Sequence, residues 1–326
     1  MKRLVSLLLS AVLVLTLFSA CSKQPTNTDP TETTAPATEP GPTESPEEAK
    51  ALKIMILGSS RSVNTFQLLY EVFKDQMPDQ ELVLGIMYYS GCSMTMHANF
   101  IMNQEAVYRY YYNATGKWVT TEGVTMEHGL TDQAWDIILL QAGNGDTANN
   151  MNESVRKFLK NYVDSKVPTP HTFWWHSTWF NSTDPQLYVN AVTNLKPENI
   201  DQYAQLTSTN DAAKEYVLND PMFAGHITSG TPMMYALKIL GVPEIDLYRD
   251  HTHLSDFGCL LVGYAWYAQF TGKPVTEIKL TTIPKHLRHR VYQSLGDMTV
   301  TEEMKDIILK TVDYTMKNPW AVPVKE

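Results

Sequence analysis

The chain has 326 residues, 43% of them hydrophobic and 19% charged, which is enough to bury the core of one large domain or two small ones. Its formal net charge is -9 at pH 7, and its pI is near 5.5. This acidic balance argues against nucleic acid, and against an anionic membrane surface, as electrostatic partners.

The N-terminus has the pattern of a targeting segment. Two basic residues precede an almost wholly apolar run at residues 4–18, and small residues follow it. This order is typical of a secretory signal, and the run is too short to span a bilayer comfortably. Residues 17–21 resemble a bacterial lipobox, with Phe18 where leucine is usual. The resemblance implies cleavage before Cys21 and a lipid on its thiol. An ordinary signal peptide with an incidental cysteine is the alternative.

The next stretch is rich in Pro, Thr and Glu and has almost no apolar residues. Such a composition cannot bury a core, so we predict that it is disordered, and its prolines make it a semi-extended spacer. The chain is therefore predicted to contain a lipoprotein signal peptide at residues 1–20, a linker at 21–50 and one domain at 51–326.

Strands and helices alternate along this domain. The predicted strands are apolar on both faces, which is typical of a parallel sheet covered by helices on each side. In such a sheet, ligands bind at the carboxyl ends of the strands. Strands are predicted at 52–57, 81–87, 136–141 and 169–175, a hairpin at 108–120, and helices at 63–74, 153–163, 201–218, 231–240, 254–270 and 301–316.

The first strand ends in Gly58, Ser59 and Ser60, and a helical pattern follows. A serine delivered to a helix N-terminus is well placed for nucleophilic attack, because the free N–H groups there favour developing negative charge. Much later, Asp250 stands three residues before His253 in a loop that enters a helix. An acid at this spacing can orient the imidazole as a general base. Taken alone, the pair is better explained by a helix cap and a surface histidine.

Together, these blocks resemble the SGNH (GDSL-like) hydrolases. The order is a Gly-Ser turn after the first strand, a Gly loop after the second, a Gly-Asn loop after the third and a late Asp-x-x-His. A closer resemblance is to an uncharacterised branch of that superfamily, whose blocks read like I-G-N-S-F-S, G-G-C-S, L-Q and R-D-G-x-H-L-S. The matching residues here are 57–62, 90–93, 140–141 and 249–255.

The resemblance implies a three-layer α/β/α sandwich with a central parallel sheet, of the SGNH or flavodoxin-like type. It also implies that Ser60 is the nucleophile, His253 the base and Asp250 its orienting acid. The N–H groups of Ser60 and Gly91 would form the oxyanion hole, with Asn144 as a third donor.

The chain departs from the family pattern around this site. Position 59 is Ser instead of Asn, and Arg61 replaces an aromatic residue. The third block places Asn144 one residue early, so the third donor is Asn144, the amide of Gln141, or absent. A missing donor costs on the order of 3 kcal/mol of transition-state stabilisation. Ser59 and Ser62 compete with Ser60, and His251 competes with His253. Spacing from Gly58 and from Asp250 favours Ser60 and His253.

Four residues are candidates for substrate contacts. Arg61 is either a clamp for an acidic substrate group, or a surface arginine, or an arginine paired with a nearby Asp or Glu. His97 either lines the pocket, as in the resembling proteins, or is a plain loop histidine. Gln141 follows the third strand and is expected at the site. Trp179 belongs to an aromatic cluster at residues 174–179, which either stacks on sugar rings or is partly core.

Other chemistry is less well supported. Cys92 and Cys259 either form a disulfide or are buried free thiols. A metal site built from His251, His253 and Asp256 lacks a ligand-spacing motif, so no metal is predicted. The sequence has no P-loop and no G-x-G-x-x-G, so no cofactor is predicted.

The sequence therefore predicts an extracytoplasmic serine esterase that acts through an acyl-enzyme. Its expected substrate is a small ester or an acylated glycan, with O-acetyl groups on glycans as the first hypothesis from location and family analogy. The membrane is expected as a partner only through the lipid at Cys21, and nucleic acid is not expected. The alternative is a weakly active or non-catalytic glycan-binding lipoprotein on the same fold.

Overall fold

The computed structural model describes residues 50–141, 152–191, 193–287 and 296–324. They belong to one unit, Glu48–Glu326. The predicted signal peptide, the lipidation candidate Cys21, nearly all of the predicted linker and the oxyanion candidate Asn144 lie outside the described residues. Among the helices that the structure describes, none combines the length and the apolar character needed to cross a membrane.

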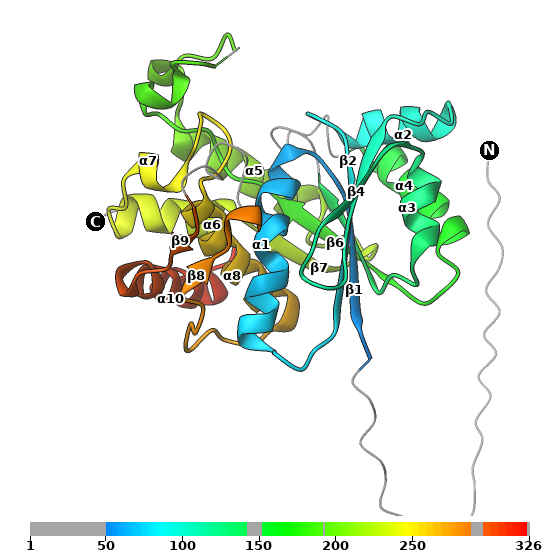
Figure 1. The fold of residues 1–326 in the computed structure, drawn as a ribbon. Helices are drawn as coiled ribbons and strands as arrows, with labels where there is room; N and C mark the ends of the chain where they lie inside the picture. The colour runs from blue at the N-terminus through cyan, green and yellow to red at the C-terminus, as the bar shows by residue number, and fades with distance from the viewer. Residues whose placement is uncertain (1–49, 142–151, 192, 288–295, 325–326) are drawn as a thin grey trace, which may run out of the picture. The chain divides into compact units, whose positions relative to one another are not determined.

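A seven-stranded sheet forms the middle layer, in the order β4-β3-β2-β1-β5-β6-β7 (Figure 1). The strands from β2 to β7 in this order pair in parallel, whereas β3 and β4 extend the β2 edge as an antiparallel hairpin. The strands are β1 (Leu52–Gly58), β2 (Leu82–Tyr88), β3 (Tyr108–Asn113), β4 (Val119–Val124), β5 (Ile137–Gln141), β6 (Thr172–Ser177) and β7 (Phe223–Thr228).

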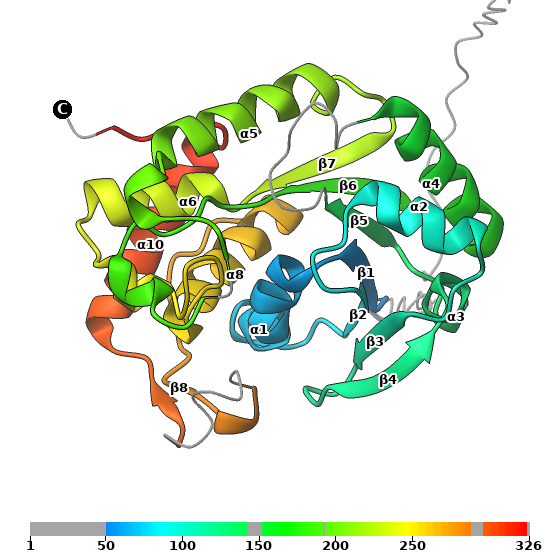
Figure 2. The same cartoon turned by 90° about the horizontal axis from the view of Figure 1, so that it is seen from above.

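Helices cover both faces of the sheet (Figure 2). Along β1, Ile54 and Ile56 join one apolar core while Met55 and Leu57 join the other, as the two-residue period of a doubly buried strand requires. The first core is closed by α1 (Ser60–Gln76), α6 (Gly230–Met234), α8 (Asp256–Thr271) and α10 (Glu302–Lys317), and the second by α2 (Met94–Met102), α3 (Met126–Asp132) and α4 (Glu153–Lys166).

The remaining described elements lie mainly between β6 and the C-terminus. Helix α5 precedes β7, a π-helical turn continues α6, and α7 precedes the candidate Asp-His loop. A short antiparallel pair, β8 and β9, follows α8. Their bounds are α5 (Gln202–Tyr216), the π-helical turn (Tyr235–Ile239), α7 (Glu244–Leu247), β8 (Thr282–Ile283) and β9 (Met298–Thr299), with 3-10 turns at Pro185–Tyr188, Pro197–Asn199 and Lys285–Leu287.

The predicted α/β/α architecture is confirmed, and so is the hairpin. Two details differ. Strand β7 was not expected, because the apolar residues of its sequence FAGHIT neither alternate nor form a continuous run. The long helix begins at Asp256 instead of residue 254, because Ser255 caps it by accepting a hydrogen bond from the Gly258 N–H.

The sheet register gathers the candidate loops at one edge. Gly58 at the end of β1 lies opposite Tyr88 at the end of β2, and Leu57 lies opposite Leu140 on β5. Helix α8 packs against α1. The loop that enters α8 therefore arrives beside the start of α1, which brings the late Asp-His block to the early serine.

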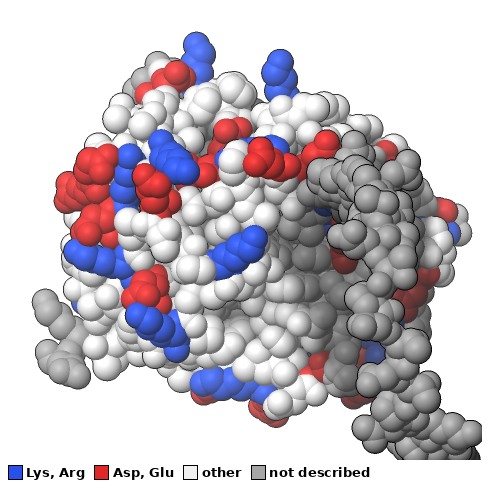
Figure 3. All heavy atoms as spheres, turned by 90° about the horizontal axis from the view of Figure 1, so that it is seen from below, with Lys and Arg blue, Asp and Glu red and all other residues white. Residues whose placement is uncertain are grey.

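Acidic and basic side chains are interspersed over the face shown in Figure 3. Helix α10 alone has three short-range pairs, Lys305–Glu302, Lys310–Asp306 and Lys317–Asp313, at 2.7–2.8 Å. Exposed pairs of this kind contribute little to stability. The described residues of this face therefore form no broad surface of one charge.

Candidate active site

The turn between β1 and α1 exposes one serine and buries two. Ser59 and Ser62 have no exposed surface, whereas Ser60, the first helical residue, is partly exposed. Gly58 precedes them because a Cβ there would collide with the Ser62 side chain. Burial therefore distinguishes Ser60 from the two competing serines.

Gln141 supports this turn from the end of β5. Its side chain is fully buried; Nε2 donates to Ser59 Oγ at 3.0 Å, and Oε1 accepts from the Ser62 hydroxyl. The structure thus corrects the expectation that Gln141 contacts substrate, because its amide faces the buried side of the turn. Sequence reasoning placed the residue at the site but could not give the direction of its side chain.

Ser60, His253 and Asp250 form a continuous hydrogen-bonded row. His253 Nε2 lies 2.9 Å from Ser60 Oγ, and His253 Nδ1 lies 2.9 and 3.0 Å from the two Asp250 oxygens. A carboxylate can only accept, so Nδ1–H donates to Asp250. In the neutral imidazole, Nε2 is then the acceptor for the Ser60 hydroxyl. This is the tautomer that a general base needs.

Asp250 is held as a carboxylate. Burial would raise its pKa, but the His253 side chain and the backbone N–H groups of Thr252 and His253 outweigh burial and hold the pKa well below its usual value. The two N–H groups donate to Oδ1 at 2.9 and 2.8 Å. Arg249 adds its Nε at 3.8 Å from Oδ2. His251, the competing histidine, instead packs on the Tyr188 ring at 5.1 Å.

The predicted oxyanion donors lie at the same sheet edge. Ser60 N–H is among the first N–H groups of α1, which have no intrahelical acceptor. Gly91 follows β2 in the left-handed region, with φ 63°, which favours glycine at this turn. The β2 loop is tied to the nucleophile turn because Tyr89 N–H donates to Gly58 O at 3.5 Å. The third predicted donor, Asn144, lies outside the described residues.

The structure corrects the expectation for Arg61. Its side chain is 4% exposed, and hydrogen bonds to neutral groups of the described chain hold its guanidinium in place. Nη2 donates to Asn181 Oδ1 at 2.9 Å and to Thr252 Oγ1 at 2.8 Å, and Nη1 donates to the Trp179 carbonyl. Arg61 therefore ties α1 to the loop after β6 and to the loop that holds His253.

His97 and Trp179 are also buried instead of lining a pocket. His97 is 1% exposed, its Nδ1 lies 2.8 Å from Tyr108 OH, and burial lowers its pKa to about 3. Trp179 is 2% exposed, and its indole N–H donates to the Thr252 carbonyl at 2.8 Å. Neither residue is placed to contact substrate. Trp179 is part of the core, which was one of its two predicted roles. His97 matches neither of its predicted roles, because it lies on helix α2 with its side chain buried.

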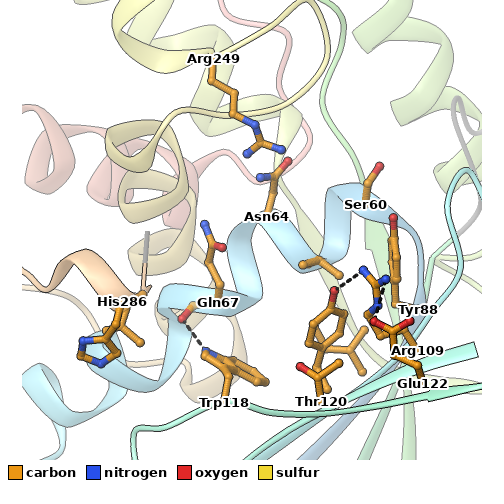
Figure 4. A pocket seen from close by; sticks show the side chains of 14 residues that line it. Ser60, Asn64, Gln67, Tyr88, Arg109, Trp118, Thr120, Glu122, Arg249 and His286 are labelled. Atoms are coloured by element: carbon orange, nitrogen blue, oxygen red, sulfur yellow. Dashed lines mark hydrogen bonds and ion pairs between the residues drawn. The ribbon is translucent and has the colours of Figure 1, made fainter. Parts of the chain in front are cut away.

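A pocket of about 630 Å³ opens beside Ser60, between α1 and the β3–β4 hairpin (Figure 4). Sequence analysis missed its walls. Two sequence signals could have indicated these walls. Ser60, Asn64 and Gln67 are spaced so that they share one face of a helix, and alternate residues of the hairpin strands share one face of the sheet. Besides Ser60, the walls include Asn64, Gln67, Tyr88, Arg109, Tyr111, Trp118, Thr120, Glu122, Arg249 and His286.

Cys92 and Cys259 are both free and buried. Burial raises the pKa of each thiol to about 12, so neither is an activated nucleophile. Within the described part of the chain, no group of three His, Cys, Asp or Glu side chains is arranged to hold a metal ion.

Comparison with solved structures shows similarity to a DUF4886 family protein from Bacteroides uniformis. It has a TM-score of 0.67 and 23% identity over 85% of this chain and 98% of the other. This likeness shows the fold.

Two acetylxylan esterases are more distant. One has a TM-score of 0.41 and 14% identity over 67% of this chain and 99% of that one. Another, from Geobacillus stearothermophilus, has a TM-score of 0.40 and 10% identity over 70% and 97% of the two chains. At this distance, neither likeness carries an argument about activity.

A search of curated proteins finds no match. A family model described as a domain of unknown function, DUF4886, matches residues 53–293, which is most of the chain. The chain therefore belongs to the DUF4886 family.

Proposed function

We propose that this protein is a serine esterase of the SGNH type. The observation that carries the proposal is the row Ser60 Oγ, His253 and Asp250, in contact through hydrogen bonds of 2.9–3.0 Å and opening onto a pocket. A partly exposed serine, a base in the right tautomer and an ionised orienting acid are the groups that acyl transfer requires.

The reaction has two halves. Ser60 Oγ attacks the ester carbonyl while His253 Nε2 takes the hydroxyl proton, and a tetrahedral oxyanion forms. The C–O bond to the alcohol then breaks as His253 returns the proton to the leaving oxygen, which leaves an acyl group on Ser60. Water, deprotonated by His253, attacks this acyl-enzyme, and the carboxylic acid leaves as Ser60 recovers its proton. No further reactant is required.

The N–H groups of Ser60 and Gly91 are the proposed donors to the oxyanion, with Asn144 as the proposed third. Support for the first two comes from the free N-terminus of α1 and the left-handed turn at Gly91. Fixed donors of this kind stabilise charge that develops only in the transition state.

The enzyme is further proposed to be lipid-anchored on the extracytoplasmic face of a bacterial membrane. Support comes from the sequence, where the lipobox-like residues end at Cys21 and a Pro-rich spacer follows. Mass spectrometry of the mature protein should find a lipid on an N-terminal Cys21, and Cys21→Ser should lack the lipid; a wild-type protein without lipid at Cys21 would contradict the anchor.

Covalent labelling tests the catalytic proposal. A fluorophosphonate should modify the wild-type protein at Ser60, because His253 activates that hydroxyl, and should fail to modify Ser60→Ala. Ser165→Ala, which removes an exposed serine on α4, serves as the control and should label as the wild type does. Intact-protein mass spectrometry followed by peptide mapping reads the result. A folded wild-type protein that is not labelled would contradict the proposal.

A further inference from the structure

The pocket beside Ser60 is nearly balanced in charge. Arg109 Nη2 lies 2.9 Å from Glu122 Oε1, and Arg109 Nη1 donates to Tyr111 OH at 3.2 Å. Arg249, the other guanidinium in the wall, lies near the Asp250 carboxylate. Each cation therefore has an anion beside it, and a charged ligand would gain little net attraction. Hydrogen-bond donors and acceptors in the pocket wall are therefore the polar groups available to recognise a ligand.

Aromatic side chains form part of the same wall. Trp118 is fixed in place because its indole N–H donates to the Gln67 carbonyl at 3.1 Å. The rings of Tyr88 and Tyr111 lie 5.9 Å apart on the neighbouring strands β2 and β3. Aromatic surface surrounded by polar side chains suits a ligand that has both an apolar face and a polar edge.

One buried acceptor in this wall has no partner within the described part of the chain. Asn64 is 3% exposed, and among the residues that the structure describes its Oδ1 has no hydrogen-bond donor. Arg249 reaches from its loop toward Asn64 (Figure 4). Its Nη1 donates to the Leu254 carbonyl at 3.1 Å, while its end lines the pocket. A buried polar atom without a partner is unfavourable until a ligand satisfies it.

A hydroxyl group is the simplest ligand group that satisfies both side chains. It donates to the Asn64 oxygen and accepts from the Arg249 guanidinium at the same time. A carboxylate would satisfy Arg249 but has no hydrogen to give Asn64. An alkyl group would satisfy neither. The chemistry of the wall therefore selects for a hydroxylated ring.

We propose that this pocket binds the alcohol side of the ester as an uncharged sugar ring, with one ring hydroxyl between Asn64 and Arg249 and the ring against the aromatic wall. The inference deepens the esterase proposal and rests on it for the position of the scissile bond. Binding of the sugar ring itself can be tested without turnover.

A set of four esters tests the selectivity. Mono-O-acetylated methyl pyranosides of glucose, galactose and xylose are compared with cyclohexyl acetate, which has a six-membered ring without hydroxyls. The wild type should hydrolyse at least one acetylated pyranoside with a kcat/KM about 10-fold or more above that for cyclohexyl acetate, as expected for one buried hydrogen bond made or lost. Equal values for all four would overturn the inference.

Variants locate the selectivity in the wall. Asn64→Leu removes the unpaired oxygen at nearly constant shape, and its selectivity ratio should fall about 10-fold. Trp118→Ala, which removes aromatic surface, is the second variant and should lower the same ratio. Lys157→Ala, on the exposed side of α4, is the control and should keep the wild-type ratio. Unchanged ratios in both pocket variants would overturn the inference.

A binding measurement separates this inference from the esterase proposal. Saturation-transfer NMR with the unacetylated methyl pyranosides on Ser60→Ala should show binding that weakens in Ser60→Ala/Asn64→Leu. Sugar binding without fluorophosphonate labelling or ester hydrolysis would overturn the esterase and support the pocket. Ester hydrolysis without ring selectivity and without sugar binding would support the esterase and overturn the sugar-binding pocket.

Discussion

At the scale of single residues, side-chain direction distinguishes the proposed nucleophile from its neighbours. Ser59, Ser60 and Ser62 have the same chemistry within four positions, yet only Ser60 is turned toward His253 and solvent. The other two close the turn around Gln141. The two serines are buried where the start of α1 meets the end of β5. Ser59 and Gln141, which are in contact there, are 82 residues apart along the chain.

Asp250 should be needed for the His253 tautomer. Asp250→Asn keeps the shape, but its amide can donate to Nδ1 and stabilise the wrong tautomer. We expect kcat to fall by roughly three to four orders of magnitude, with little change in KM. Steady-state kinetics on an activated acetate ester would measure the loss.

The control for this substitution is Asp246→Asn, an exposed acid on α7 that should keep wild-type rates. A loss smaller than about 10-fold in a folded Asp250→Asn protein would show that Asp250 does not orient the base.

At the scale of elements, one buried arginine links three segments. Arg61 stands next to Ser60 on α1 and donates to Asn181 after β6 and to Thr252 beside His253. Its guanidinium also lies over the Trp179 ring at 5.5 Å. Arg61 therefore holds the loop that carries His253 against helix α1.

Arg61 should act as a positioning residue. Arg61→Met leaves a buried carbonyl and two polar side chains without their donor, so we expect the free energy of unfolding to fall by about 2–4 kcal/mol. It should also lower kcat more than it raises KM, because His253 loses its fixed position. Arg61→Lys keeps one charged donor and should recover part of both quantities. Urea unfolding and steady-state kinetics measure the two effects.

A buried arginine elsewhere provides the matched control. Arg156 on α4 is 5% exposed and pairs with Asp220 at 3.1 Å. Arg156→Met should destabilise the fold by a similar amount while kcat stays at the wild-type value. Equal losses of kcat in the two variants would contradict a positioning role for Arg61 and point to general destabilisation.

The elements themselves differed in how well they could be predicted. The parallel strands β1, β2 and β5 carry apolar residues on both faces, so their burial is visible in the sequence. Strand β7 lies at the sheet edge and was missed, because only half of its six residues are buried. The hairpin was predicted from its turn, where Asn113 Oδ1 accepts from the N–H groups of Thr115 and Gly116. Its role as a pocket wall was not.

At the scale of the whole molecule, two buried histidines link stability to pH. Burial lowers the pKa of His97 to about 3, and burial, with Arg61 nearby, lowers the pKa of His176 to about 3. Both stay neutral in the folded protein from pH 7 down to about 3, whereas unfolded histidine binds a proton near pH 6.5. The unfolded state then binds more protons, so stability falls as pH falls through this window.

We therefore expect the free energy of unfolding to decrease from pH 7 to pH 4, by up to about 1.4 kcal/mol per pH unit for each histidine. The lowered pKa of Asp250 acts in the same direction, but only below about pH 4, where the unfolded carboxylate takes up a proton. Urea unfolding at a series of pH values measures the slope. His97→Gln should make it shallower by up to half, and an unchanged slope would show that His97 is not responsible.

The sequence by itself determined the alternation of strands and helices, the Gly-Ser turn and the Asp250–His253 spacing. These features depend on the periodicity of apolar residues and on residues only a few positions apart, and both can be read directly from the sequence. Only the tertiary structure decided that Arg61, His97, Gln141 and Trp179 turn inward and that Asn64, Trp118 and Arg249 face the pocket. A side chain's surroundings come from segments distant along the chain, and burial and partners exist only after those segments have packed.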